Sequence, residues 1–261
     1  MLLRSPTWLW PNLLSLDAPI VALIWQLLFA RSFHVRVPWP ATLLLAACVW
    51  MIYVADRLLD SLTCQPHTAR HLFHRSHFSS FVLGLGLCIL ASLALLLTKV
   101  DAGVRAAGLP MTAAMAAYFA LVHAAPAAWQ KYWPKELAVA ILFALGTCLP
   151  VYAEAPAAGP AMLPSLALFA NVCWMNAVAI DRWERKQAPA WLVPLALTAS
   201  GLALALSISG HPWLYCAAAF AAASLAWLIQ RRERISLDKR CVLADAVLAA
   251  PALSALLMLW R

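Results

Sequence analysis

The feature that most constrains this chain is a series of nine apolar segments, each long enough to cross a bilayer as a helix, which takes about 17–25 mostly apolar residues. The segments are residues 13–30, 38–55, 79–98, 106–125, 137–153, 161–180, 190–209, 212–229 and 242–260. Charged residues make up only 11% of the chain, less than half of the ~25% found in soluble domains. The segments lack the alternating pattern of barrel strands. We therefore expect an all-α integral membrane protein with about nine transmembrane helices.

The distribution of basic residues predicts how these helices are oriented. The N-terminus and the loops after the even-numbered segments hold 14 of the 19 lysines and arginines. Because basic loops stay on the cytoplasmic side, we expect a cytoplasmic N-terminus and an external C-terminus, in a bacterial inner (plasma) membrane. This bias explains the net charge of +8, so no nucleic-acid partner is expected. Residues 1–261 are expected to form a single membrane domain, with residues 60–78 as a cytoplasmic cap loop.

Two of the predicted helices end in similar charged sequences. The second helix ends in YVADRLLD, and the sixth ends in VAIDRWER. In each, an apolar run is followed by Asp-Arg and by another acid within a turn. At about 100° per residue, the acids of each pair lie on one helix face, about 40° apart for Asp56 and Asp60 and about 60° apart for Asp181 and Glu184. Both pairs are expected at the cytoplasmic surface.

Paired acids of this kind suggest a site for a divalent metal ion. Mg²⁺ prefers oxygen ligands and commonly bridges one or two carboxylates to the phosphates of a substrate. The neighbouring Arg57 and Arg182 could bind phosphate oxygens. The alternative is that the charges only mark where two helices leave the lipid, with each arginine neutralising its aspartate. The repetition of the pattern on one side of the membrane favours a shared site.

These sequences resemble the UbiA superfamily of intramembrane prenyltransferases, nine-helix proteins with two Asp-rich motifs at the cytoplasmic ends of helices 2 and 6. YVADRLLD is similar to the A-D-R-x-x-D part of the first motif, and IDRWERK is similar to the second, a D-R-x-[DE]-[DE]-like cluster. SLDAPIVALIW (Ser15–Trp25) is similar to the R-L-D-x-P-I start of the family's first helix. PAAWQKYWPKELAVAILFALGTCLP (Pro126–Pro150) is similar to its helix 4–5 connection. The resemblance covers helices 1 to 6 in order.

The resemblance implies a helical bundle around a central cavity that opens to the cytoplasmic side. It also implies Mg²⁺-dependent transfer of an isoprenyl group from an isoprenyl diphosphate to a hydrophobic acceptor, either aromatic or lipid. Mg²⁺ and basic side chains would stabilise charge on the leaving diphosphate. An apolar cavity would keep water from the allylic cation. Membrane lipid is the other expected partner, and no protein partner is predicted.

Each role in this reaction is assigned to residues of this chain. The predicted Mg²⁺ ligands are Asp56, Asp60, Asp181 and Glu184. The predicted diphosphate-binding residues are Arg57, Arg70, Lys131, Lys135, Arg182 and Lys186. The residues predicted to line the cavity or contact the acceptor are Tyr53, Asn171, Trp174, Asn176 and Asp245.

Departures from the family pattern keep other functions open. Ile52 and Tyr53 stand where the first motif has Asn and Asp, and Arg185 stands where the second motif often has an acid. Trp174 replaces an Asp that several members carry. The alternative function is therefore a catalytically degenerate UbiA-like protein that binds lipid or acts as a scaffold. A transporter would carry charges deep in several helices, and a CDP-alcohol phosphatidyltransferase would need glycines that its motif places around the acids and that are missing here.

Four histidines follow the first motif and fall within about a 120° arc of a helix. They are His67, His71, His74 and His77. They could ligate a metal, since His at i and i+4 is a usable spacing. They could instead belong to a basic cap helix over the site, which the neighbouring Arg70 and Arg75 favour.

Several other polar residues have two interpretations. Lys131 and Lys135 could reach the diphosphate or anchor their loop at the interface. Asp245, an acid inside an apolar segment, could be functional or could pair with a basic residue of the preceding loop. Asn171 and Asn176 could line the cavity or hydrogen-bond between helices.

Overall fold

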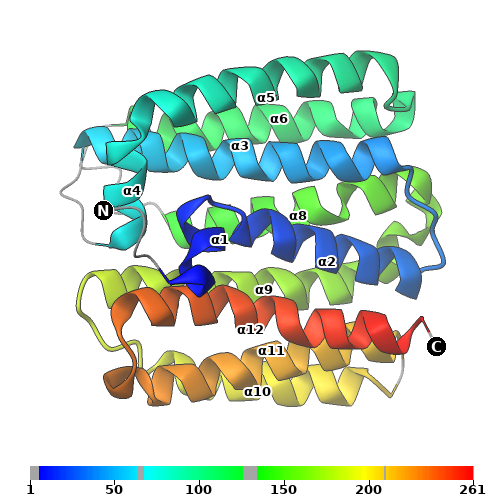
Figure 1. The fold of residues 1–261 in the computed structure, drawn as a ribbon. Helices are drawn as coiled ribbons and strands as arrows, with labels where there is room; N and C mark the ends of the chain where they lie inside the picture. The colour runs from blue at the N-terminus through cyan, green and yellow to red at the C-terminus, as the bar shows by residue number, and fades with distance from the viewer. Residues whose placement is uncertain (1–5, 64–67, 126–133, 209, 261) are drawn as a thin grey trace.

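The computed structural model describes residues 6–63, 68–125, 134–208 and 210–260, which form a bundle of helices without a strand among them (Figure 1). The α-helices are α1 (Trp10–Leu13), α2 (Asp17–Ser32), α3 (Trp39–Thr63), α4 (Ala69–Ser76), α5 (Phe78–Thr98), α6 (Ala102–His123), α8 (Lys135–Glu154), α9 (Gly159–Glu184), α10 (Leu192–Leu206), α11 (Pro212–Gln230) and α12 (Leu237–Met258). Three short 3₁₀ turns are η2 (Thr7–Leu9), η3 (Pro156–Ala158) and η4 (Arg232–Arg234). The predicted all-α class is confirmed.

Fewer helices than predicted can cross a membrane. Within the described ranges, seven helices are long and apolar enough, and an eighth span results if the bent pair of α1 and α2 counts as one. The predicted segment 190–209 forms only α10, a helix of 15 residues. At 1.5 Å per residue it is about 22 Å long, short of the ~30 Å hydrocarbon core. The count of nine is therefore not reached, although each apolar segment does form a helix.

The first predicted segment is broken near its start. Ser15 adopts a left-handed conformation with φ 55°, and the chain bends by 84° between the helical residues before and after this break. Asp17 therefore begins α2, where a negative charge interacts favourably with the helix dipole. The start of α2 lies at the same end of the bundle as α4 (Figure 1).

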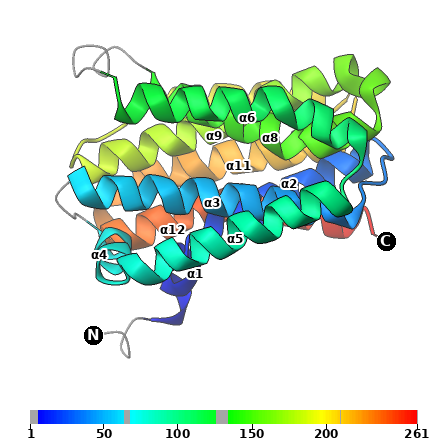
Figure 2. The ribbon, with the colours of Figure 1, turned by 90° about the horizontal axis from the view of Figure 1, so that it is seen from above.

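The bundle core lies among α2, α8, α9, α11 and α12. Trp25 of α2 stacks on Phe169 of α9 with ring centroids 4.2 Å apart, and its Nε1 donates to the carbonyl of Leu248 in α12 at 3.0 Å. The helices α5 and α6 lie at the margin of the bundle (Figures 1 and 2). Few of their residues are buried, so they present apolar side chains outward, as lipid-facing helices do.

The predicted cap segment contains α4, which is hydrogen-bonded to residues before α2 and in α12. The Ser15 hydroxyl and Nε2 of His74 are 3.2 Å apart, and the amide of Ala69 donates to Asp238 at 3.2 Å. His74 is fully buried, and this burial, together with the nearby positive charges of Arg57 and Arg70, lowers the pKa of its imidazole to about 4, although its hydrogen bond to the carbonyl of Arg70 opposes the shift. His74 is therefore neutral near pH 7.

The described histidines of the predicted cluster do not converge on a common point. His71 contacts Arg57 at 3.2 Å, His74 contacts Ser15, and His77 stacks on Phe73 with ring centroids 4.4 Å apart. His67 lies outside the described residues. These contacts agree with a cap helix and give no support to a histidine metal site.

Candidate functional site

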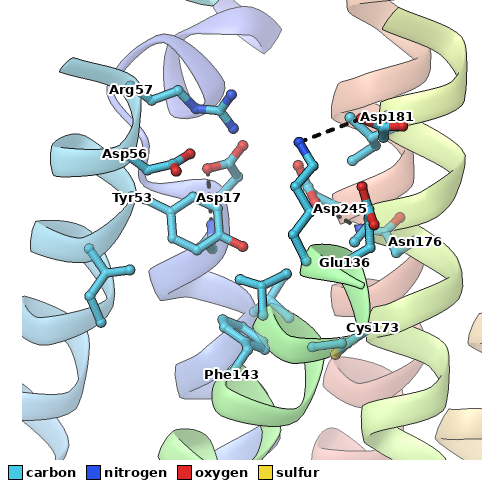
Figure 3. Close-up of a pocket in the computed structure, with 18 of the residues that line it drawn as sticks. Asp17, Tyr53, Asp56, Arg57, Glu136, Phe143, Cys173, Asn176, Asp181 and Asp245 are labelled. Carbon is cyan, nitrogen blue, oxygen red and sulfur yellow. Dashed lines mark hydrogen bonds and ion pairs between the residues drawn. The ribbon is translucent and has the colours of Figure 1, made fainter. Parts of the chain in front are cut away.

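A pocket lies at the end of the bundle where α3 and α9 finish and α8 begins. It is lined by residues of α2, α3, α4, α6, α8, α9 and α12, and Figure 3 shows the charged side chains that face into it. Ten of the predicted site residues line it: Tyr53, Asp56, Arg57, Asp60, Arg70, Lys135, Asn176, Asp181, Glu184 and Asp245. The two Asp-Arg helix ends, 125 residues apart in the sequence, thus contribute to one pocket.

Helical spacing explains which residues of α9 face the pocket. The lining residues form a stripe at intervals of three and four: Cys173, Asn176, Ala177, Ile180, Asp181 and Glu184. Such residues share one face of a helix. The stripe brings Asp181 and Glu184 into the pocket together, as their spacing predicts.

Four predicted residues of α9 and the turn after it are not among those that line the pocket. Arg182 is exposed and its guanidinium donates to Gln187, because it is rotated about 100° from Asp181. Lys186 is exposed just beyond the helix, with φ 57°. Trp174 packs against Trp191 with ring centroids 6.3 Å apart, and Asn171 also lies off the stripe.

The predicted pair of diphosphate-binding lysines, Lys131 and Lys135, is only partly described. Lys131, a predicted diphosphate ligand, lies outside the described residues. Lys135, its partner in that prediction, begins α8 and lines the pocket with its side chain 46% exposed. Lys135 therefore combines contact with the pocket and access to solvent.

One acid of α3 lies near a basic group of α6. A carboxylate oxygen of Asp56 is 3.7 Å from Nε2 of His123, at the end of α6. Arg57 lies beside Asp56 in the sequence and lines the pocket with it. Asp60 lines the same wall one helical turn nearer the mouth.

The acids of α9 are held by closer ion pairs. Asp181 lies 2.9 Å from the guanidinium of Arg185 and 3.8 Å from Nζ of Lys135. Glu184 accepts a bond of 2.5 Å from Arg70 of the cap helix, and the Arg70 side chain is only 6% exposed. Burial works to lower the pKa of Arg70, but Glu184 and other nearby acids raise it above its ordinary value. Arg70 therefore stays cationic.

The carboxylate oxygens of the pocket are ligands that suit Mg²⁺, although the acids do not form a complete metal site by themselves. In the described part of the chain, no three His, Cys, Asp or Glu side chains are grouped closely enough to hold a metal ion. A site of this kind needs only one or two carboxylates plus substrate phosphates, and each helix end offers two. Among the described lining residues, seven are acids and three are basic. This acidic excess would repel a diphosphate unless cations bridge the two.

Sequence reasoning missed three polar residues at this site. Asp17 and Glu136 line the pocket, and His123 contacts Asp56. Asp17 could have been predicted from the sequence, because it is an acid inside the predicted apolar segment 13–30, and the same feature marks Asp245 as a candidate. Glu136 and His123 had no such feature, since polar residues at helix ends are common and only the packing of α6 and α8 brings these two to the pocket.

The structure also settles how Asp245 is paired. It accepts a hydrogen bond from the amide of Asn176 at 3.2 Å. Arg240, one of the basic residues before it, lies over the ring of Trp183 instead, 5.7 Å from its centroid. Asp245 therefore belongs to the pocket and not to the basic loop.

Comparisons of this chain with models of known protein families, with curated protein sequences and with solved structures each found no match.

Proposed function

We propose that this chain is an intramembrane prenyltransferase of the UbiA type, which transfers an isoprenyl group from an isoprenyl diphosphate to a hydrophobic acceptor. The observation that carries the proposal is that the Asp-Arg ends of α3 and α9 line one pocket. A charged pocket at one end of an apolar bundle suits a ligand with an anionic head and an apolar tail. In this proposal the pocket opens to the cytoplasm of a bacterium, with the N-terminus inside and the C-terminus outside.

The basic residues of the pocket would bind the diphosphate. Arg57 extends toward the pocket from α3 (Figure 3), and Lys135 lines it from the start of α8. Both would stabilise the charge that develops on the leaving group. The predicted acids of α3 and α9 would hold Mg²⁺, which supplies further positive charge to that group when bound. The apolar side chains of Ile52, Phe119 and Phe143 line the same pocket and would exclude water from the reacting carbon.

The size of the pocket limits what it takes in. Its volume of about 230 Å³ is below the ~300–1,000 Å³ of most small-molecule sites. We therefore expect the pocket to hold the diphosphate and the reacting end of the isoprenyl group. The rest of the isoprenyl chain would lie between the helices or in the lipid.

The test is diphosphate release by the purified protein in Mg²⁺, with geranyl, farnesyl and geranylgeranyl diphosphate as donors and a lipid extract as a source of acceptor. We expect release with at least one donor, reduced at least 100-fold in Asp56→Asn and Asp181→Asn. The matched control is Asp101→Asn, because Asp101 is an exposed residue at the other end of the bundle, before α6. Neither release nor Mg²⁺-dependent binding with any donor would refute the proposal.

One observation favours a second candidate, a catalytically degenerate relative that binds lipid. Glu184 and Asp181 are already paired with Arg70 and Arg185, so the second acidic pair is neutralised without a metal. Mass spectrometry of the purified protein would then find a bound lipid that stays chemically intact. Asp56→Ala would leave that lipid bound, because no metal would be involved in holding it.

A further inference from the structure

The start of α12 holds a group of cationic side chains that is separate from the pocket. Residues 231–240 include five basic side chains and only two acids. Helix α12 begins at Leu237, which is also the first residue of a helix long and apolar enough to cross a membrane. Lys239 and Arg240 therefore lie where this helix would enter the bilayer, at the end of the bundle where α9 finishes (Figure 1). Neither is among the described residues that line the pocket.

The positive charge of Lys239 and Arg240 is not balanced by the acids of the same segment. Glu233 is 84% exposed and pairs with its neighbour Arg232, and Asp238 accepts a hydrogen bond from the first amide of α4. Within the described ranges, neither Lys239 nor Arg240 forms an ion pair. The residue before α12 also gives its first amides no side-chain cap. Because the N-terminal end of a helix favours anions and disfavours cations, this helix start has a strong preference for an anion.

Lys239 and Arg240 are each placed against a tryptophan ring. Nζ of Lys239 lies 5.9 Å from the ring centroid of Trp8, and the guanidinium of Arg240 lies 5.7 Å from that of Trp183. Trp8 belongs to η2 and Trp183 to the end of α9, so two separate parts of the bundle position the two cations. Such contacts attract a cation without neutralising its charge. We call Trp183, Lys239 and Arg240 the α12 corner.

The α12 corner contains two buried hydrogen-bond donors that lack an acceptor. Trp183 is only 1% exposed, and neither its Nε1 nor Nε of Arg240 has a hydrogen-bond partner among the described residues. Indole and guanidinium nitrogens donate hydrogen bonds and do not accept them. The two side chains therefore cannot satisfy each other, and leaving buried donors unpaired is costly. The missing partner is an acceptor, which an anion would supply.

An apolar face of α12 begins beside the α12 corner. Exposed positions follow one another along the helix at intervals of three and four residues: Lys239, Leu243, Ala246, Ala250, Leu253 and Leu257. Residues at such intervals share one face of a helix. Since α12 is one of the helices apolar enough to cross a membrane, this face would lie against acyl chains. A ligand with a negative head and apolar tails would match both parts.

We propose that the α12 corner binds the phosphate group of an anionic phospholipid, a site that does not depend on the proposed prenyl transfer. Arg240 is partly exposed; it turns toward the phosphate and opens Nε1 of Trp183 to it. Both then donate hydrogen bonds to phosphate oxygens, as does Lys239, and such charge-assisted bonds are the strong ones. The acyl chains lie along the exposed face of α12. A zwitterionic lipid binds less well, because its own cation meets two that are already there.

The experiment measures lipid binding to the delipidated protein in a neutral detergent, by native mass spectrometry and by the rise in melting temperature. The probes are dioleoylphosphatidylglycerol, dioleoylphosphatidylcholine and glycerol 3-phosphate, which is a headgroup without acyl chains. We expect phosphatidylglycerol to bind at least tenfold more tightly than phosphatidylcholine, and glycerol 3-phosphate to bind at least 100-fold more weakly than phosphatidylglycerol.

Two double variants separate a specific site from general attraction to a basic loop. Lys239→Gln with Arg240→Gln should weaken phosphatidylglycerol binding at least tenfold. The matched control is Arg231→Gln with Arg234→Gln, which removes the same charge from two exposed residues of the same segment and should change binding by no more than about threefold. Trp183→Phe keeps an aromatic ring but removes the Nε1 hydrogen, and should weaken binding at least threefold. It tests the site even where the first double variant does not fold.

Four results would overturn the inference. Equal affinity for the two lipids would show that the negative charge is not recognised. Equal losses in the two double variants would show that the whole segment attracts anions without a defined site. Glycerol 3-phosphate binding as tightly as phosphatidylglycerol would identify a soluble anion as the ligand, and unchanged binding in Trp183→Phe would remove the buried donor from the site. None of these measurements involves diphosphate release, so the proposed function stands or fails separately.

Discussion

The ion pair between Arg70 and Glu184 is predicted to fasten the cap helix to the bundle. The two side chains meet at 2.5 Å and are 6% and 21% exposed, so both charges are largely shielded from water. Removing one member of a buried pair leaves the other uncompensated and costs about 3–5 kcal/mol. Because Glu184 keeps some exposure, we expect a loss of about 3 kcal/mol for Glu184→Gln and for Arg70→Met.

Thermal unfolding of the purified protein measures this loss. For domains of 150–250 residues, 1 kcal/mol lowers Tm by about 2–4 °C, so each single variant should melt about 6–12 °C below the wild type. The double variant should lose less than the sum of the two, since no charge is then left alone. The matched control is Arg185→Met, which breaks a pair whose arginine is 58% exposed. Such surface pairs are worth about 0–1 kcal/mol.

Two results would refute this reasoning. One is that the single variants melt within about 2 °C of the wild type, which would mean that Arg70 and Glu184 find water or other partners when separated. The other is that the losses add in the double variant, which would mean that the two residues stabilise the protein independently.

Three further predictions follow from the same contacts. Because the folded pKa of His74 is about 4, below the ~6.5 of free histidine, the unfolded chain binds the proton first, and stability should fall by up to about 3 kcal/mol as pH drops from 6.5 to 4. His74→Gln should remove this pH dependence, and His34→Asn, at an exposed site, should not. Trp25→Phe should lower stability by about 1–2 kcal/mol by removing the bond to Leu248, measured by thermal unfolding. Removing Mg²⁺ with EDTA should weaken farnesyl diphosphate binding at least tenfold, because acids outnumber basic residues in the pocket; unchanged binding would contradict the assigned metal role.

Helix content and the acidic helix ends could be predicted because both depend on local sequence. Apolar runs long enough to span a bilayer can only be helices or barrel strands, and an alternating pattern is missing. Asp181 and Glu184 face one way because of the helical period alone. The same period turns Arg182 away from the pocket face, because adjacent residues of a helix are about 100° apart.

The inclusion of Asp17 and Asp245 in one pocket could not be predicted in the same way, because it depends on contacts between distant helices. Asp17 and Asp245 are separated by 228 positions and line one pocket only because α2 packs against α12, with Trp25 bonded to Leu248. The ion pair of Arg70 was similarly hidden, since its partner Glu184 lies 114 positions away in the sequence. The seventh predicted segment, residues 190–209, is too short to span the membrane for a local reason, since α10 ends at Leu206, shortly before Gly210 and Pro212.

The walls of the pocket come from helices that are packed to different degrees, and this difference suits the proposed reaction. Asp17, Asn176 and Asp245 line the pocket from α2, α9 and α12, which belong to the core, and half of the most apolar stretch of α9 is buried. On the opposite wall, only 6% of the corresponding stretch of α6 is buried. An acceptor oxygen must be held about 3–3.5 Å from the reacting carbon, which requires rigid support. The diphosphate must enter and leave in each turnover, which a less tightly packed wall permits. We therefore expect substitutions in the core of α2 and α12 to impair transfer more than donor binding.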